Sequence, residues 1–157
     1  MDGTPPFLVA LAGWVVPGAG YWLIGQRGRA ILVGVAILVL FFSGILFAGM
    51  RVIDVPGYDD HGQKVLMADR SGDWKLLAQP FASIVDKPWY VAQILTGPVS
   101  IICSKLSLDA SRGPDPYPKV KSRLGEIGTL YTAIAGMLNL LAIIDAGHRA
   151  QNEGEQA

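Results

Sequence analysis

The sequence predicts an all-α membrane protein with four apolar helical segments in a single membrane domain, residues 1–157. Hydrophobic residues make up 51% of the chain and charged residues 17%. The charges are also segregated: residues 7–25, 30–50, 89–104 and 127–146 together contain one charged residue, Asp145, whereas the other 81 residues contain 25. A helix of a soluble protein keeps a polar, solvated face, so this segregation indicates that the four segments lie in a bilayer.

The composition excludes several other classes of protein. Thirteen basic residues balance thirteen acidic ones, so no net charge favours nucleic acid as a partner. The single cysteine, Cys103, excludes an internal disulfide framework and a cysteine-rich metal site. The high hydrophobic fraction excludes a disordered chain.

Segment 30–50 is the clearest predicted membrane span. Its 21 residues would form a helix of about 32 Å, enough for a hydrocarbon core of about 30 Å. Ser43 is its one side chain with a hydrogen-bonding group, and Arg29 and Arg51 flank it. We expect this segment to cross the membrane.

Segment 127–146 is the second predicted span. Gly128, Thr132 and Gly136 follow one another at intervals of four residues, so they share a small-residue helix face that allows close helix packing. Asn139 lies within the segment and Asp145 at its end. A charge at the end of a span costs less than one at its centre.

The first segment, 7–25, contains a predicted helix break. The sequence Pro17-Gly18-Ala19-Gly20 interrupts it, because proline removes an amide donor and glycine adds backbone freedom. Two interpretations stay open. The favoured one is a short helix that ends near Val16 and leads into a turn, and the other is a re-entrant hairpin.

The third segment, 89–104, is short for a span. Its 16 residues give about 24 Å as a straight helix, so we expect it to extend to Leu108 to complete the crossing. Trp89 and Tyr90 would lie at the interface. Pro98 after Gly97 predicts a kink that neighbouring helices must accommodate.

Basic residues in short loops predict the orientation. The turn after the first segment carries Arg27 and Arg29, and loop 105–126 carries five more basic residues. A four-span arrangement places both on one side. We therefore expect loop 105–126 to be cytoplasmic, at a bacterial inner membrane, with loop 51–88 and the C-terminal tail 147–157 outside.

The two loops differ in composition. The outer loop has 38 residues, and its stretches 65–68 and 74–78 flank a turn-rich sequence at 69–73, which predicts a small hairpin. The inner loop contains Gly113-Pro114-Asp115-Pro116-Tyr117-Pro118. That composition indicates an extended linker without a helix.

One local pattern is more specific than the rest, and we interpret it as a helix break, an aromatic pair and a second turn at Gly25 and Gly28. It reads Pro17-Gly18-Ala19-Gly20-Tyr21-Trp22-Leu23-Ile24-Gly25-Gln26-Arg27-Gly28-Arg29. Residues 7–50 thereby resemble the two-helix "TM-two" type of transmembrane domain. The whole layout also resembles small bacterial multi-pass membrane proteins of unknown function. The resemblance implies a compact membrane module and brings no catalytic residues with it.

Candidate sites for ligands are few, and we expect no cofactor. The stretch Gly18-Ala19-Gly20 lacks the Lys-Ser/Thr pair of a phosphate-binding loop, so no nucleotide is expected. Asp59, Asp60 and His61, with Asp54 nearby, could hold a divalent ion, but a solvated turn is the favoured interpretation. Asn139, Asp145 and His148 form the other polar group. Polar residues within spans are functional candidates, although packing between helices is favoured here.

Three functional hypotheses follow. The favoured one is a non-enzymatic subunit or scaffold that assembles with other membrane proteins or with itself through the Gly128/Thr132/Gly136 face, with membrane lipids around it. The second is a small transporter or channel-like element that uses the broken first helix with Asn139 and Asp145. The third is a membrane enzyme that uses the outer-loop acids.

Overall fold

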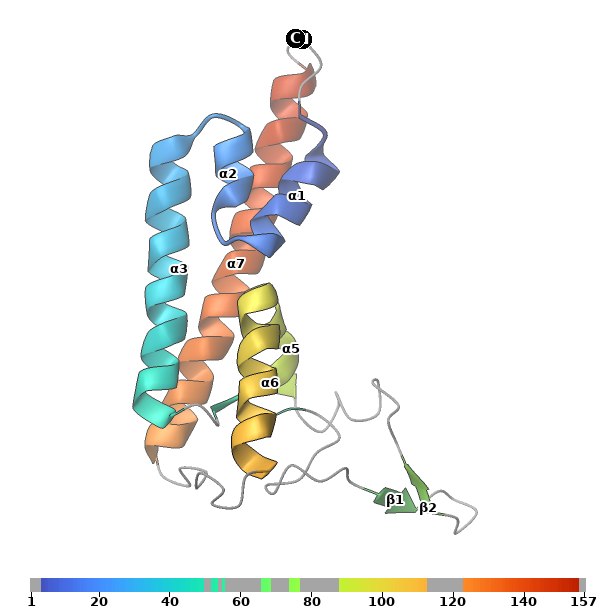
Figure 1. Ribbon diagram of the computed structural model, residues 1–157. Coiled ribbons are helices and arrows are strands. Elements are labelled where there is room, and N and C mark those ends of the chain that lie inside the picture. The colour runs from blue at the N-terminus through green and yellow to red at the C-terminus, as the bar shows by residue number, and fades with distance from the viewer. Residues whose placement is uncertain are drawn as a thin grey trace.

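The computed structural model describes residues 4–49, 52–53, 55, 66–68, 74–76, 88–112 and 123–155. Within these ranges the chain is a helical bundle with one short pair of strands (Figure 1). In chain order the elements are α1 (Pro6–Val15), α2 (Ala19–Leu23), α3 (Arg27–Ala48), β1 (Leu66–Ala68), β2 (Trp74–Leu76), α5 (Pro88–Ile94), α6 (Pro98–Arg112) and α7 (Arg123–Glu155).

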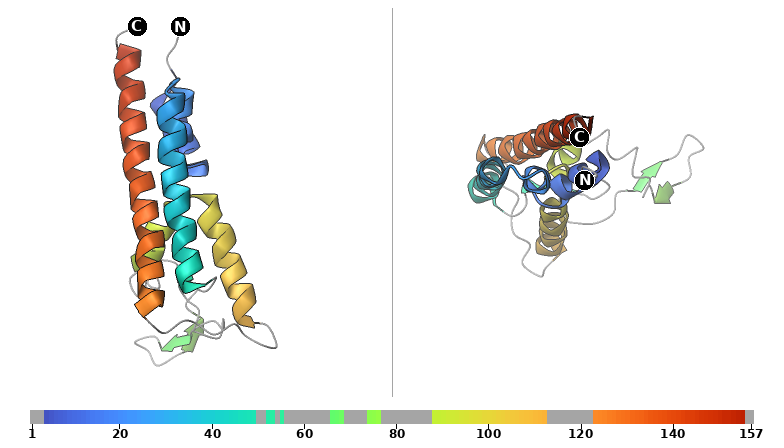
Figure 2. Two further views of the ribbon diagram at one scale, coloured as in Figure 1. Left: turned by 90° about the vertical axis from the view of Figure 1, so that its left-hand side faces the viewer. Right: turned by 90° about the horizontal axis from the view of Figure 1, so that it is seen from above.

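Helices α3 and α7 run the length of the bundle side by side in opposite directions (Figures 1 and 2). The stretches Arg27–Ala48 and Arg123–Asn152 are long and apolar enough to cross a membrane. Small residues let the two helices approach closely: a Cβ at Gly44 would lie 2.7 Å from the Gly128 carbonyl oxygen and 2.8 Å from Cγ2 of Thr132. The predicted small-residue face of α7 thus lies against α3 of the same chain.

The first apolar segment forms a hairpin rather than one continuous helix. Helix α1 ends at Val15, and Val16 is extended, as the residue before a proline prefers. Gly18 then adopts φ 87°, a left-handed conformation that glycine reaches without strain. Helix α2 runs back along α1, so that a Cβ at Gly20 would lie 2.9 Å from the Val9 carbonyl oxygen. The turn occurs within the predicted break.

The third apolar segment also forms a hairpin, whereas its sequence predicted a single kinked helix. Helix α5 ends at Ile94, Gly97 has φ 98°, and α6 begins at Pro98 and returns towards the end from which α5 came (Figure 1). Instead of a kinked helix crossing the bundle, residues 88–112 form two helices that reach about halfway along it. The expected crossing at 89–104 is therefore not what the structure shows, and the predicted set of four apolar helices is not confirmed.

This second hairpin changes the relation between the loops. Ser107 of α6 donates a hydrogen bond to the Ile53 carbonyl oxygen at 3.1 Å, so α6 returns to the end of the bundle at which α3 stops. Both the 51–88 loop and the loop between α6 and α7 therefore start and finish at this end, which we call the loop end. The opposite end, with the α2–α3 turn and the last turns of α7, is called the turn end. The sequence predicted these loops on opposite sides of the membrane, whereas in the structure the residues that flank both loops lie at one end of the bundle.

The loop boundaries also differ from those expected. Helix α6 continues to Arg112 and α7 already begins at Arg123, so both helices extend into the predicted linker 105–126. The rest of that linker, 113–122, lies outside the described residues. At the turn end, α7 extends to Glu155 through most of the predicted tail. In the 51–88 loop, β1 and β2 pair antiparallel with Met67 opposite Lys75, at the position of the predicted hairpin.

The bundle interior is unusual because much of it is polar. Gln93, Thr96, Ser100, Thr132 and Asn139 are all at most 1% exposed. The apolar core consists of two clusters, one around Ile37 and Phe41 and the other around Val9, Tyr21 and Ala146. Many large aliphatic side chains instead lie on the outer surface.

Gly136 provides a test of this packing. A Cβ at Gly136 would collide with the Ala92 carbonyl oxygen of α5 and would lie 3.1 Å from the Thr96 hydroxyl, whereas nothing lies within 4 Å of a Cβ at Gly28. We expect Gly136→Ala to lower the free energy of unfolding by about 1–3 kcal/mol. Gly28→Ala is the matched control and should change it by less than about 0.5 kcal/mol. Thermal unfolding in mild detergent measures both, and equal stability of the two variants would contradict the packing described.

Candidate functional site

The interior polar side chain that contacts both hairpins is Asn139, at the middle of α7. Its Nδ2 donates hydrogen bonds to the carbonyl oxygens of Gly13, at 3.2 Å, and Leu95, at 2.9 Å. Gly13 belongs to the last turn of α1, and Leu95 directly follows α5. One amide group therefore joins the inner ends of both hairpins to the long helix.

The two carbonyls need this donor because of the prolines that follow them. In a continuing helix the Gly13 carbonyl would accept the amide of residue 17, but Pro17 has no amide hydrogen. After α5, successive amides bond three residues back, ending with Gly97 to Ile94 at 3.0 Å. The next amide in that series would belong to residue 98, but Pro98 has no amide hydrogen. The Leu95 carbonyl is therefore left without a backbone partner. Asn139 supplies the missing donor at both breaks.

Further polar groups surround this junction. Gln93 donates to the Thr132 hydroxyl at 2.7 Å and so attaches α5 to α7 about two turns of the long helix closer to the loop end. The Thr96 hydroxyl and the Asn139 side-chain oxygen are buried without a hydrogen-bond partner. A Cβ at Gly97 would collide with the Trp14 carbonyl oxygen, so the hairpin turns contact each other end to end.

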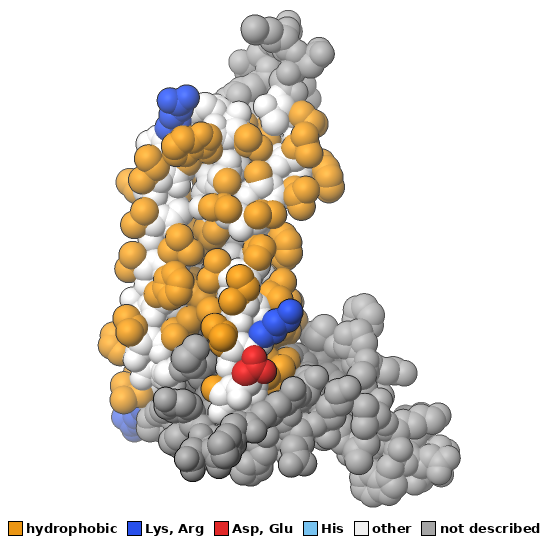
Figure 3. Space-filling view, in the orientation of Figure 1, with side chains coloured by type: hydrophobic (Ala, Val, Ile, Leu, Met, Phe, Trp, Pro, Cys, Tyr) orange, Lys and Arg blue, Asp and Glu red, His pale blue; other side chains and the backbone are white. Residues whose placement is uncertain are grey.

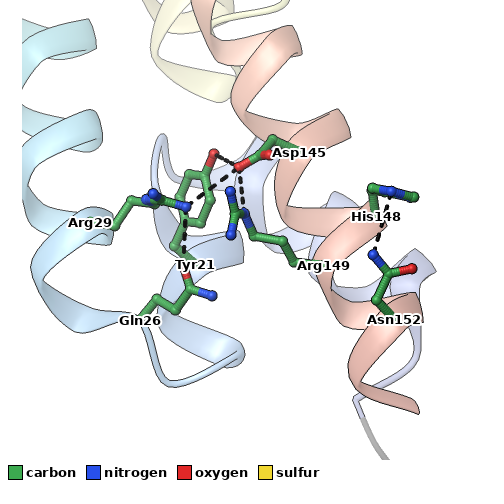
Figure 4. Close-up of polar contacts among 7 residues, drawn as sticks. All are labelled: Tyr21, Gln26, Arg29, Asp145, His148, Arg149 and Asn152. Carbon is green, nitrogen blue, oxygen red and sulfur yellow. Dashed lines mark hydrogen bonds and ion pairs between the residues drawn. The ribbon is translucent and has the colours of Figure 1, made fainter. Parts of the chain in front are cut away.

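A second polar cluster lies at the turn end, around Asp145 (Figure 4). The Tyr21 hydroxyl and Nε of Arg149 each donate to Oδ2 of Asp145 at 2.8 Å, and Arg29 lies 3.9 Å from the same oxygen. The Arg29 guanidinium also lies 5.8 Å from the centre of the Tyr21 ring. The cluster connects α2, the start of α3 and α7. Its three charged side chains are 38–45% exposed, whereas Tyr21 is buried.

The structure separates the polar residues that the sequence placed together. Asn139 lies at mid-length of the bundle and Asp145 nearer the turn end, and no contact joins them. His148 lies on the other side of α7, where its Nε2 is 3.4 Å from Nδ2 of Asn152 (Figure 4). Asn139 and Asp145 thus belong to two different clusters, and both clusters hold helices together.

The candidate metal ligands Asp59, Asp60 and His61 lie outside the described residues. Within the described ranges, no group of three His, Cys, Asp or Glu side chains lies close enough to hold a metal ion. Among the predicted turn residues, Pro17, Gly18 and Gly20 lie in the first hairpin, where Pro17 contacts Gly34 of α3. Gly25 lies in the α2–α3 turn with φ 75°, and Gly28 lies in the first turn of α3.

Several residues of the two clusters were not singled out from the sequence. Gln93 and Thr96 are the interior polar residues of segment 89–104, which is too short to cross a membrane as a straight helix. The short length of this segment is itself a signal of a hairpin. Tyr21 and Arg29 are far from Asp145 in the sequence. The pairing of Arg149 with Asp145 was accessible from their spacing of four residues along a helix, but the contact with Tyr21 depends on the first hairpin folding back.

Apart from its one short pair of strands, the described part of the chain is thus a helical bundle with two long apolar helices and two half-length hairpins joined by buried hydrogen bonds. A family model matches residues 8–156, and the chain belongs to that family, DUF6677, a family of unknown function. Neither the curated proteins nor the solved structures gave a match to the chain. The family match runs through both hairpins and does not set residues 7–50 apart as a two-helix domain.

Asn139→Leu tests the role of the side-chain amide. Leucine has a similar volume but cannot donate, so two buried carbonyls lose their partner. Each such loss costs about 1–3 kcal/mol, and we expect a fall in the free energy of unfolding within or above that range, measured in mild detergent.

The matched control is Asn152→Leu, which removes an exposed amide from the same helix and should change stability by less than about 0.5 kcal/mol. Hydrogen exchange adds a local measurement, since the Asn139 variant should lose protection in both hairpins. A variant as stable and as protected as the wild type would show that Asn139 does not join them.

Proposed function

We propose that this protein is an integral membrane module, non-enzymatic, which acts as a subunit or scaffold of a membrane assembly. The observation that carries the membrane part of this proposal is the distribution of polarity between the interior and the surface. The interior contains Gln93, Thr132 and Asn139, each with a hydrogen bond, whereas the outer surface is apolar. That is the reverse of a water-soluble bundle.

The outward side chains support the same conclusion. Leu46 of α3 is 83% exposed, Leu32 is 70% exposed and Leu141 of α7 is 62% exposed. Hydrophobic side chains cover the visible surface of the helices along most of their length, with charged groups towards the two ends (Figure 3). In water these side chains would favour aggregation, whereas in lipid tails their exposure carries no such cost.

Hydrogen bonding within the hairpins fits the same environment. Backbone groups at membrane depth must be paired within the protein, and irregular backbone is tolerated there where it is buried. Both helix breaks meet this condition through Asn139 and through contacts with neighbouring helices. Two spanning helices, α3 and α7, and two half-depth hairpins make up the proposed arrangement.

The position of the loops favours one orientation. The two loops, α6 and the first residue of α7, Arg123, carry ten of the thirteen basic residues, whereas the turn end carries Arg27, Arg29 and Arg149. Because basic loops stay in the cytoplasm, the loop end faces the cytoplasm in this proposal. The 113–122 loop keeps its predicted side and the 51–88 loop moves to join it.

Reporter fusions test this topology. Fusions after Gly62 and after Asp115 should both report a cytoplasmic location, and a fusion after Asn152 should report the opposite side. Each fusion is made with two reporters, one active only in the cytosol and one active only outside. Every fusion site then gives a positive signal in one of the two assays. Opposite signals from Gly62 and Asp115 would restore a four-span arrangement and contradict the half-depth hairpins.

The role as a subunit requires a different surface from the one expected. Gly128, Thr132 and Gly136 contact α3 and α5 of the same chain, so assembly with a partner uses another face. Affinity purification from native membranes in mild detergent should yield a homo-oligomer or a stoichiometric partner. A strictly monomeric particle across several mild detergents would count against the subunit role while leaving the membrane location intact.

A small transporter or channel-like element is the second candidate. The observation that favours it is that a short helix, a glycine turn, a second short helix and a long helix occur twice in opposite directions, an order typical of inverted-repeat transporters. Their breaks meet near the buried oxygens of Thr96 and Asn139. Ion flux into liposomes that disappears in Asn139→Leu but not in Asn152→Leu would support this candidate, and absence of flux from the wild type would remove it.

A further inference from the structure

An apolar groove opens on the surface between the first hairpin and α3. Its volume is about 380 Å³. The hairpin contributes Val16, Pro17 and Trp22 to its lining, and α3 contributes Ile31, Val35 and Leu38. Trp22, Ile31 and Val35 are each about half exposed, so the groove is open to the surroundings along its length.

The groove has the depth of one half of a bilayer. Along α3 its lining runs from Ala30, near the turn end, to Leu38, a distance of about 12 Å along a helix. Half of a hydrocarbon core is about 15 Å. The inner limit of the groove is the Pro17–Gly18 turn, where the hairpin reverses in mid-bundle.

A cation lies at the rim of the groove. The Arg27 guanidinium is 5.8 Å from the centre of the Trp22 ring, and Trp22 lines the groove. Arg27 is exposed, and in the described part of the chain no carboxylate pairs with it. Its neighbour Arg29 differs, because it lies beside Asp145. The guanidinium of Arg27 thus places a positive charge at the turn end of the apolar groove.

We propose that this groove binds an anionic glycerophospholipid, with one acyl chain along Ile31, Val35 and Leu38 and the phosphate beside Arg27. The inference rests on the proposed membrane location. Charge complementarity determines the choice of occupant, because an apolar helix from a partner would fill the groove but would leave the Arg27 guanidinium without an anion. A phospholipid provides both an apolar chain of suitable length and a phosphate at its end, and arginine is well suited to bind phosphate.

Trp22 provides the readout. A variant in which Trp14, Trp74 and Trp89 are changed to Phe retains Trp22 as its single tryptophan, in the groove itself. Reconstituted into vesicles that contain lipids with brominated acyl chains, its fluorescence is quenched in proportion to the occupancy of the groove by the brominated lipid. Brominated phosphatidylglycerol is compared with brominated phosphatidylcholine, each in a background of the other lipid without bromine.

The expected result is preferential quenching by phosphatidylglycerol, about fivefold in relative binding for one arginine near the membrane surface. Arg27→Gln should abolish the preference, and Arg123→Gln, which removes a charge at the loop end, should retain it. Val35→Phe, which narrows the groove, should reduce quenching by phosphatidylglycerol in the same assay.

Three outcomes would overturn the proposal. Equal quenching by the two lipids would show that Arg27 selects no anion, and unchanged quenching in Val35→Phe would show that the chain does not enter the groove. Trp22 quenched by neither lipid would show that a protein surface covers the groove. If the protein instead failed to insert into the vesicles, as measured by flotation, the membrane location itself would be wrong.

Discussion

A backbone carbonyl that has lost its helical partner must be paired within the protein when water is absent, and this constraint organises the molecule. Pro17 and Pro98 remove the donors that Gly13 and Leu95 would otherwise use. Both carbonyls accept from the single amide group of Asn139. The two prolines break two helices and thereby produce two hairpins. The asparagine allows these breaks to lie in the interior, since an unpaired carbonyl there would cost more than the hydrogen bond itself contributes.

The remaining contacts follow from the position of the hairpins. Because the two turns meet end to end along α7, backbone approaches backbone, and only glycine leaves room at Gly97 and Gly136. Polar side chains such as Gln93 and Thr132 then occupy the interior as hydrogen-bonded pairs, and the bulky aliphatic residues lie outside. At the turn end, Asp145 fixes the other end of the first hairpin through Tyr21. Buried hydrogen bonds and small residues, rather than a large apolar core, therefore hold this bundle together.

The sequence was informative about elements and much less so about their direction. Segregated charges identified α3 and α7, and the Pro17–Gly20 sequence located the first turn, because both effects are local. The same local information at Gly97-Pro98 was compatible with a kink or a reversal, and the choice depends on whether a donor such as Asn139 is present on another helix. That partnership spans 44 residues from Leu95 and 126 from Gly13. The small-residue face of α7 could be recognised because Gly128, Thr132 and Gly136 are four residues apart. This spacing does not determine whether the face packs against the same chain or against another one.

Solid-state NMR of the protein in lipid bilayers tests the joining of both hairpins by Asn139 most directly. The chain has two asparagines, Asn139 and Asn152, so a sample with ¹⁵N-labelled asparagine and ¹³C-carbonyl glycine and leucine contains two labelled side-chain nitrogens. The account predicts through-space correlations from the Asn139 side-chain nitrogen to the carbonyl carbons of both Gly13 and Leu95. The Asn152 side-chain nitrogen should show neither and serves as an internal control. A correlation to one carbonyl alone, or to none, would contradict the joining of the two hairpins at Asn139.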